Sequence, residues 1–165
     1  MFLLKSEEAF QALYATESRG VQRFLEGMVG GRQVAEELTQ DAFIKAWKAL
    51  PSFALKSSLK TWVYSIAINT ARDWLRGHGN KRMSELTDEH GGAQEMESPE
   101  TRAIREAMGE LEEEIRALLM LHYYEELSLQ EIAKILAIPT GTVKSRLHTA
   151  KAKLKPLLVA KGFDV

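Results

Sequence analysis

The chain has 165 residues, which is enough for one domain or for two small helical domains. It contains no cysteine, so disulfides and thiolate metal sites are excluded and a reducing compartment is the simplest fit. The sequence has no apolar run of about 18 residues, and its start, MFLLKSEEAF, is too short for a secretory signal. We therefore expect a cytoplasmic protein with no membrane insertion.

The formal net charge of -1 conceals an uneven distribution. Residues 1–82 hold 12 Lys and Arg against 8 Asp and Glu, and residues 115–165 hold 8 against 4. Between them, residues 83–114 hold only 2 Lys and Arg against 11 Asp and Glu. Two mildly basic segments separated by an acidic one indicate two separate modules that face nucleic acid.

Helical spacing of apolar residues predicts a first helix over residues 6–30, whose apolar side we interpret as core. A second helix is predicted over residues 33–50, where Pro51 stops it. One side of this helix is rich in alanine and is expected to be buried. Another side of this helix carries Glu37, Gln40, Asp41, Ile44 and Lys48. These residues suit contact with a protein partner as well as contact with water, and composition alone favours a solvated surface.

A third helix is predicted over residues 59–76, with Val63, Ala67, Thr70 and Trp74 directed inward. A second row along it offers a ring for stacking, an amide for a base edge and guanidiniums for the backbone, with Lys60 and Tyr64 beside it. These groups suit unpaired bases. The residues alone favour equally an alternative in which Trp62 is core and the rest is a solvated rim. The row comprises Trp62, Ser65, Asn69, Arg72 and Arg76.

Residues 77–103 change in character, with four glycines, a proline, many acids and no apolar periodicity. This composition predicts a flexible linker. A further helix is expected from about Pro99 to Tyr124, with a start or a break near Glu110. The predicted fold is all-α, with two helical domains at residues 1–80 and 103–165 joined by a flexible acidic linker at residues 81–102.

Residues 127–155 predict two short helices joined by a tight turn. Ser128 and Glu131 have the capping-box spacing, and Pro139 favours the start of the second helix. Val143, Leu147, Ala150 and Leu154 form a buried stripe on that second helix. Its basic outer side is typical of a helix that enters the DNA major groove, and a hairpin with a solvated basic side is the less favoured alternative. The outer residues are Thr142, Lys144, Ser145, Arg146, His148, Thr149 and Lys151.

Motifs of catalysis are absent from the sequence. It has no phosphate-binding glycine loop in the right context, no HExxH and no GxSxG. No nucleophile, base and orienting group combine. We therefore expect no catalytic residues, no metal site and no cofactor, and we do not expect an enzyme.

Three motifs together resemble the extracytoplasmic-function (group IV) sigma factors of bacteria, over nearly the whole chain. The first is AEELTQDAFIKAWKAL at residues 35–50, which looks like the family's helix for binding core polymerase. The second is KTWVYSIAINTARDWLR at residues 60–76, which is similar to the family's Thr-Trp-Leu-Tyr-Arg-Ile-Ala-x-Asn signature. The third covers residues 111–154 and ends in IPTGTVKSRLHTAKAKL.

The resemblance implies an alternative sigma factor that binds core RNA polymerase, recognises the -35 and -10 promoter elements and assists strand opening, controlled by an anti-sigma factor. The polymerase's largest subunit would contact the second helix through Glu36, Glu37, Gln40, Asp41 and Ile44. The -10 element would contact Lys60, Trp62, Tyr64, Ser65, Asn69, Arg72 and Arg76. Within this set, Asn69 matches a position that helps to hold a base out of the stack. The -35 element would receive the helix at residues 140–153, through the seven outer residues named above.

Some positions depart from the family pattern. Ser65 stands where arginine is frequent, and residues 54–58 replace a frequent Arg-Gly-Asp-like stretch, where residues 56–58 would shape the base pocket. Ala137 replaces a frequent turn glycine, at a cost of about 1 kcal/mol if this residue needs a positive φ.

The alternative function is a helix-turn-helix transcriptional regulator with an N-terminal dimerisation or sensing domain, which leaves the row from Trp62 to Arg76 unexplained.

Overall fold

The computed structural model describes residues 2–53, 57–78 and 98–165, and every regular element in these ranges is helical. The N-terminal elements are α1 (Phe2–Val29), α2 (Arg32–Ala49), a short 3-10 turn η1 (Leu50–Ser52) and α3 (Leu59–His78). The C-terminal elements are α5 (Pro99–Gly109), α6 (Glu113–Leu119), the π-helical turn η2 (Met120–Tyr124), α7 (Leu129–Leu136) and α8 (Thr140–Ala160). The all-α prediction is confirmed. The predicted linker falls mostly on residues 79–97, outside the described residues.

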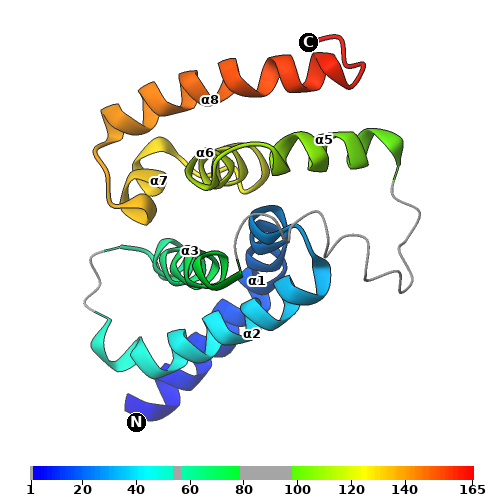
Figure 1. Ribbon diagram of the computed structural model, residues 1–165. Coiled ribbons are helices and arrows are strands. Elements are labelled where there is room, and N and C mark those ends of the chain that lie inside the picture. Colours follow the sequence, from blue (N-terminus) through cyan, green and yellow to red (C-terminus); the bar gives the residue numbers. More distant parts are fainter. Residues whose placement is uncertain (1, 54–56, 79–97) are drawn as a thin grey trace.

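The helices are stacked in layers, with α8 on one side, α5, α6 and α7 in the middle, and α1, α2 and α3 on the other side (Figure 1). Within the N-terminal group α1, α2 and α3 pack against one another, and within the C-terminal group α6 and α7 pack against α8. The two groups also touch, because α7 lies against α3 and α6 lies against α1. One buried apolar cluster runs through both groups.

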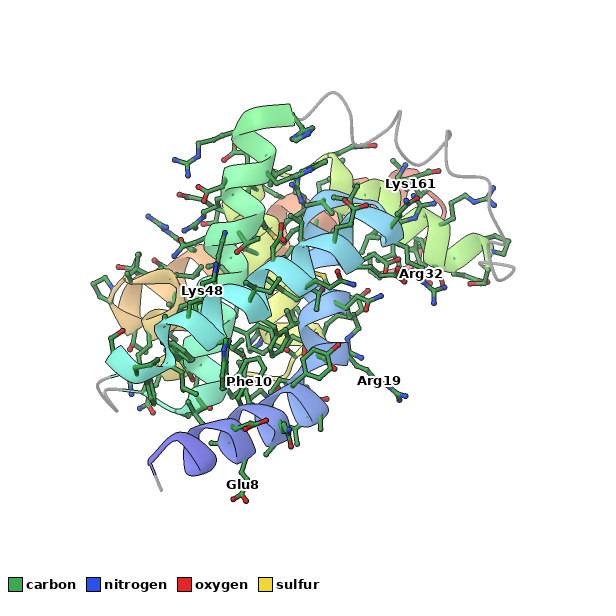
Figure 2. All side chains as sticks on the ribbon, turned by 90° about the horizontal axis from the view of Figure 1, so that it is seen from below. Glu8, Phe10, Arg19, Arg32, Lys48 and Lys161 are labelled. Carbon is green, nitrogen blue, oxygen red and sulfur yellow. The ribbon has the colours of Figure 1, made fainter. Side chains whose placement is uncertain are left out.

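The alanine side of α2 is buried, as predicted, with Ala35, Ala42 and Ala46 fully covered. Where α2 crosses the first half of α1, aromatic side chains make the contact between the two helices. The ring of Phe10 lies edge-on to those of Phe43 and Trp47, at centroid distances of 6.2 and 5.1 Å (Figure 2). These contacts fix the exposed side of α2 relative to α1.

The segment from Pro99 to Tyr124 is broken, as the glutamate run near Glu110 indicated. Helix α5 begins inside residues 81–102, the range assigned to the linker, because Ser98 caps it by accepting a bond from the Thr101 amide at 3.2 Å. The sequence did not predict the π-helical turn η2, in which the Glu125 amide bonds to the Met120 carbonyl at 3.1 Å. This extra residue per turn directs Glu125 toward the N-terminal helices.

The C-terminal helix is longer than predicted, since the predicted pair of helices ended at residue 155 and α8 continues to Ala160. Proline removes one backbone donor and disfavours a helix interior. Packing compensates for this loss, because Leu154 and Leu157 pack against the core and Lys161 lies 3.4 Å from Glu106 of α5. Tertiary contacts therefore override the local signal.

The predicted helix-turn-helix is confirmed. Ser128 and Glu131 form a reciprocal capping box, with the Ser128 amide donating to Glu131 Oε2 at 2.8 Å and the Glu131 amide to Ser128 Oγ at 3.1 Å. Val143, Leu147 and Ala150 are buried and Leu154 is half-buried. The turn passes through Ala137 in the left-handed region, at φ 55° and ψ 45°.

Replacing Ala137 by glycine is expected to stabilise the fold by about 1 kcal/mol, because glycine lacks the Cβ that opposes this conformation. Chemical denaturation followed by circular dichroism measures the change. Ala152→Gly, at an exposed position in α8, is the matched control and is expected to cost about 1 kcal/mol. Destabilisation by both substitutions would contradict the strain at Ala137.

Candidate nucleic-acid interface

The outer side of α8 carries the seven residues predicted for major-groove contact. Six are exposed, and Thr142 is half-buried. Two hydroxyls are turned toward the helix backbone, with Ser145 Oγ donating to the Thr142 carbonyl at 3.1 Å and Thr149 Oγ1 to the Ser145 carbonyl at 3.2 Å. The predicted surface is therefore present as one continuous exposed side of a helix.

Three cations on α8 have partners on the neighbouring elements. Arg146 lies 3.6 Å from Glu114, and Lys153 lies 3.6 Å from Glu112. The ammonium group of Lys151 lies 5.7 Å from the ring centroid of the exposed Tyr123. Pairs this exposed contribute little to stability, so phosphate groups are able to replace the carboxylates.

The predicted row on α3 is only partly open. Asn69 and Arg76 are exposed, and Arg76 pairs with Asp73 of the same helix. The half-buried ring of Trp62 packs on Phe53, with centroids 4.9 Å apart. The Ser65 hydroxyl turns toward its own helix and donates to the Thr61 carbonyl at 3.1 Å, while Lys60 is half-buried.

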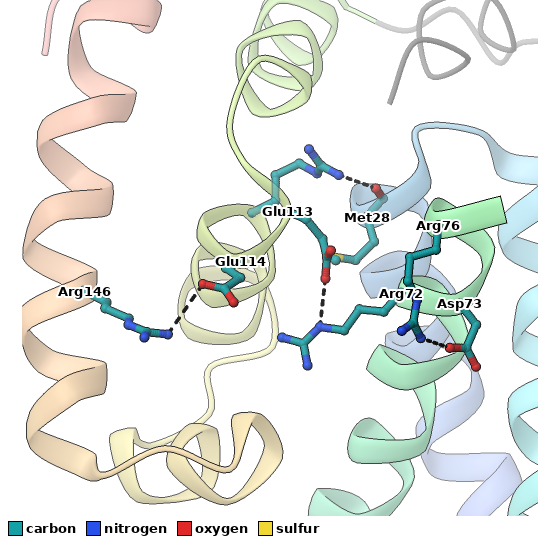
Figure 3. Close-up of polar contacts among 8 residues, drawn as sticks. Met28, Arg72, Asp73, Arg76, Glu113, Glu114 and Arg146 are labelled. Atoms are coloured by element: carbon teal, nitrogen blue, oxygen red, sulfur yellow. Dashed lines mark hydrogen bonds and ion pairs between the residues drawn. The ribbon is translucent and has the colours of Figure 1, made fainter. Parts of the chain in front are cut away.

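Tyr64, which lies beside the row, and Arg72, which belongs to it, both contact C-terminal elements. Tyr64 is fully buried, and its hydroxyl donates to Glu125 Oε2 at 2.8 Å. Burial, together with the nearby carboxylate of Glu125, raises the pKa of the Tyr64 phenol far above its ordinary value. Arg72 Nε donates to Glu113 Oε1 at 2.8 Å (Figure 3). The structure therefore does not bring all seven predicted residues onto one accessible surface.

The inward side of α3 was predicted correctly for three of its four residues. Val63, Ala67 and Thr70 are buried. Trp74 is only half-buried, and its ring stacks on His78 at a centroid distance of 4.4 Å. The described part of the pocket-shaping loop contributes Ser58, whose hydroxyl accepts a bond from the Thr61 amide at 3.1 Å and so caps α3. Lys56 lies outside the described residues.

All five residues predicted to bind polymerase lie on the exposed side of α2. Ile44 is 53% exposed, which is unusual for an isoleucine on a helix with a well-packed opposite side. Two aromatic neighbours were missed by the sequence reasoning, Trp47 at 44% exposure and Tyr14 at 47%. The sequence could have indicated Trp47, because it follows Ile44 by three positions and residues at this spacing share one side of a helix.

Within the described ranges, no three His, Asp or Glu side chains gather into a group that could hold a metal ion. None of the described helices combines the length and the apolar character that crossing a bilayer requires.

Comparison with protein families gives two matches that follow the two groups of helices. The sigma-70 region 2 family matches residues 13–81, which include α2 and α3. The sigma-70 region 4 family matches residues 101–154, which include the helix-turn-helix. The two surfaces therefore lie in two separately recognised units.

Individual relatives agree with this pattern along most of the chain. The RNA polymerase sigma-H factor of Pseudomonas aeruginosa is 33% identical, over 92% of this chain and 89% of the relative. The ECF RNA polymerase sigma-E factor of Escherichia coli K12 is also 33% identical, over 92% and 90%. The sigma factor RpoE of Bartonella quintana, solved in complex with the anti-sigma factor NepR, has a TM-score of 0.70 at 25% identity, covering 92% of this chain and 97% of the other. The chain therefore belongs to the extracytoplasmic-function group of RNA polymerase sigma factors.

Proposed function

We propose that this chain joins core RNA polymerase as a dissociable, alternative sigma factor, recognises the -35 and -10 promoter elements and assists strand opening. The observation that supports this most strongly is the order of three surfaces along one chain: a protein-binding side on α2, a base-binding row on α3 and a basic helix-turn-helix. A helix-turn-helix regulator needs only the third surface. The proposed role of this chain is binding and strand separation, without a covalent step of its own.

Each surface has a proposed role. Residues 1–80 form the unit that binds polymerase and the -10 element, and residues 103–165 form the unit that binds the -35 element. The segment 81–102 connects them. On α2, the carboxylates of Glu37 and Asp41 beside the apolar Ile44 offer a partner both charge and buried area. On α8, Lys144 and Arg146 are placed to contact bases and phosphates in the major groove.

Strand opening follows from the properties of α3. Extruding a base costs a few kcal/mol of lost stacking, and a binding pocket must offset that cost. The exposed amide of Asn69 offers a donor and an acceptor to a base edge, and the partly exposed ring of Trp62 offers a stacking surface. We infer that these two groups hold the unpaired -10 strand, with Arg76 on its backbone.

The cytoplasmic location and the control by an anti-sigma factor are parts of the same proposal. The Bartonella quintana relative forms a complex with an anti-sigma factor. We propose a partner of that kind for this chain.

Replacing Asn69 by alanine is expected to reduce strand opening about tenfold or more, because an extruded base loses its edge contacts with the amide. A good pair of hydrogen bonds to one base edge contributes about 1–3 kcal/mol. Permanganate reactivity of unpaired thymines in the promoter complex measures the opening. Gln33→Ala removes an exposed amide at the start of α2 and is expected to leave it unchanged. Equal reactivity in the Asn69 variant and the parent chain would contradict the assigned role.

The regulator alternative makes a different prediction for binding. A regulator binds duplex DNA without polymerase, usually as a dimer, whereas a sigma factor binds promoter DNA tightly only with core polymerase. Gel-shift measurements with and without core polymerase separate the two. Tight binding by a dimer in the absence of polymerase would overturn the proposal.

A further inference from the structure

Four cations of α8 lie on two sides that flank its outer surface, and their partners differ. Arg146 and Lys153 are seven positions apart, and each lies 3.6 Å from a glutamate at the start of α6. Lys144 and Lys151 are exposed and also seven positions apart, so they share one side of the helix. Two positions separate the pairs, which is about 200° of rotation, so the two sides are nearly opposite. Within the described ranges, carboxylates pair only with the two cations that lie toward α6.

The ring of Tyr123 lies beside Lys151. The Lys151 ammonium is 5.7 Å from the ring centroid, within the roughly 6 Å of a cation–π contact. The Tyr123 ring is held in turn by the His122 ring, which lies edge-on to it at a centroid distance of 4.7 Å. The turn η2 beneath both rings is anchored, because Met120 and Leu121 are buried. Tyr123 is therefore a fixed support for a cation at the end of a flexible stem.

An aromatic partner leaves the charge of Lys151 available to an anion. A carboxylate neutralises the cation that it pairs with, whereas the face of a ring attracts a cation without carrying a net charge. The two glutamates that follow η2 do not take this place. Glu125 is directed inward, with its side chain 4% exposed, and Glu126 forms no ion pair in the part of the chain that the structure describes. A phosphate therefore has no carboxylate to displace at Lys151.

The position of Lys151 on α8 suits the DNA backbone better than the bases. The major groove is about 12 Å wide, and a helix with its side chains is about 10–12 Å in diameter. A helix in the groove therefore directs its outer residues to the bases and its two flanks to the sugar-phosphate backbones. Lys144 and Lys151 lie on one flank, about 10 Å apart along the helix axis. This flank is expected to follow one backbone.

We propose that Tyr123 is a positioning residue of the -35 surface, whose ring holds the Lys151 ammonium on the flank of α8 where it contacts a phosphate of the promoter backbone. This inference rests on the proposed function of α8 and adds the turn η2 to that surface. A lysine that is already in place loses less side-chain entropy when it binds a phosphate. Tyr123 therefore strengthens promoter binding through Lys151, without a base contact of its own.

The role of the ring is tested with core polymerase saturated by the chain and a labelled promoter fragment, at salt concentrations from about 50 to 200 mM. Tyr123→Leu is expected to weaken binding about threefold, the size of an exposed cation–π contact. Tyr123→Phe keeps the ring and is expected to retain the parent affinity. Tyr124→Leu is the matched control, since Tyr124 is 45% exposed and no cation of the described ranges lies over its ring. Equal affinities of Tyr123→Leu and the parent chain, or an equal loss in Tyr124→Leu, would overturn the proposal.

The route through Lys151 is tested by a double-mutant cycle. Lys151→Ala removes a phosphate contact, so the slope of log K against log salt concentration is expected to fall by about 1. In this background Tyr123→Leu is expected to have no further effect, because coupled residues do not act additively. A threefold loss that persists without Lys151 would overturn the positioning role. Weaker transcription by Tyr123→Leu at unchanged promoter affinity would assign the ring to a protein partner and would also overturn it.

Failure of the proposed function is distinguishable from failure of this inference. A parent chain that gives core polymerase no promoter binding contradicts the sigma function. Binding of the full chain alone to a plain duplex at low salt then tests the inference by itself, because phosphate contacts do not depend on sequence. The same order of affinities, with Tyr123→Leu below Tyr123→Phe and the parent chain, would support the role of Tyr123. Equal affinities of these three chains would overturn it.

Discussion

Replacing Arg116 by leucine is expected to lower the free energy of unfolding by about 3 kcal/mol, because two buried carbonyl groups lose their charged donor. Arg116 donates to the Leu111 carbonyl at 2.6 Å and to the Met28 carbonyl at 2.9 Å. The Met28 carbonyl is in the last turn of α1 and has no acceptor role inside the helix. Burial lowers the pKa of the Arg116 guanidinium, because its charged form loses contact with water in the folded state.

Chemical denaturation of the full chain measures this loss. Arg146→Leu makes the same change at a half-exposed arginine with a 3.6 Å ion pair, and it is expected to cost less than about 0.5 kcal/mol. Similar losses for both variants would contradict the role of Arg116 as a buried link between α1 and the α5–α6 turn.

Reversing the charge of Asp41 with arginine is expected to weaken binding to core polymerase about thirtyfold, or about 2 kcal/mol. Asp41 is exposed on α2, on the side that carries Ile44, and nothing in the described ranges packs over that side. A like charge placed in a complementary interface costs binding free energy without disturbing the core. The fold of the free chain is therefore expected to be unaffected.

Fluorescence anisotropy of the labelled chain, titrated with core polymerase, gives the dissociation constant. Glu8→Arg makes the same change of charge on the outer side of α1, away from α2 (Figure 2), and is expected to leave the affinity unchanged. If both reversals weaken binding equally, the effect is one of net charge and the assigned surface is wrong.

Local signals in the sequence were sufficient for the helix-turn-helix. The capping box, the turn at Ala137 and the buried stripe through Val143 depend on residues within a few positions of one another, so spacing alone predicts them. The predicted end of α8 was wrong, because the contact between Lys161 and Glu106 that supports the longer helix joins residues 55 positions apart.

The contacts between the two groups of helices had no local signal. The pairs Arg72–Glu113, Tyr64–Glu125 and Arg116–Met28 are separated by 41, 61 and 88 positions. Tyr64 therefore looked like a surface aromatic beside a basic row, and the structure buries it instead. Gly20 and Gly27 lie inside α1 where these contacts are closest: an added Cβ would lie 2.8 Å from Glu125 Oε2 at Gly20 and 2.5 Å from Met120 Cε at Gly27. Glycine is costly inside a helix, but neither glycine indicates which segment packs against it.

The most direct test of the sigma function is transcription by purified core RNA polymerase on genomic DNA fragments, with and without this chain, followed by mapping of the RNA starts. We expect discrete starts that require the chain and that share two upstream sequence elements. We also expect Asp41→Arg to weaken every start and Asn69→Ala to weaken strand opening at each of them. An unchanged set of starts, together with tight binding of duplex DNA without polymerase, would contradict the sigma function.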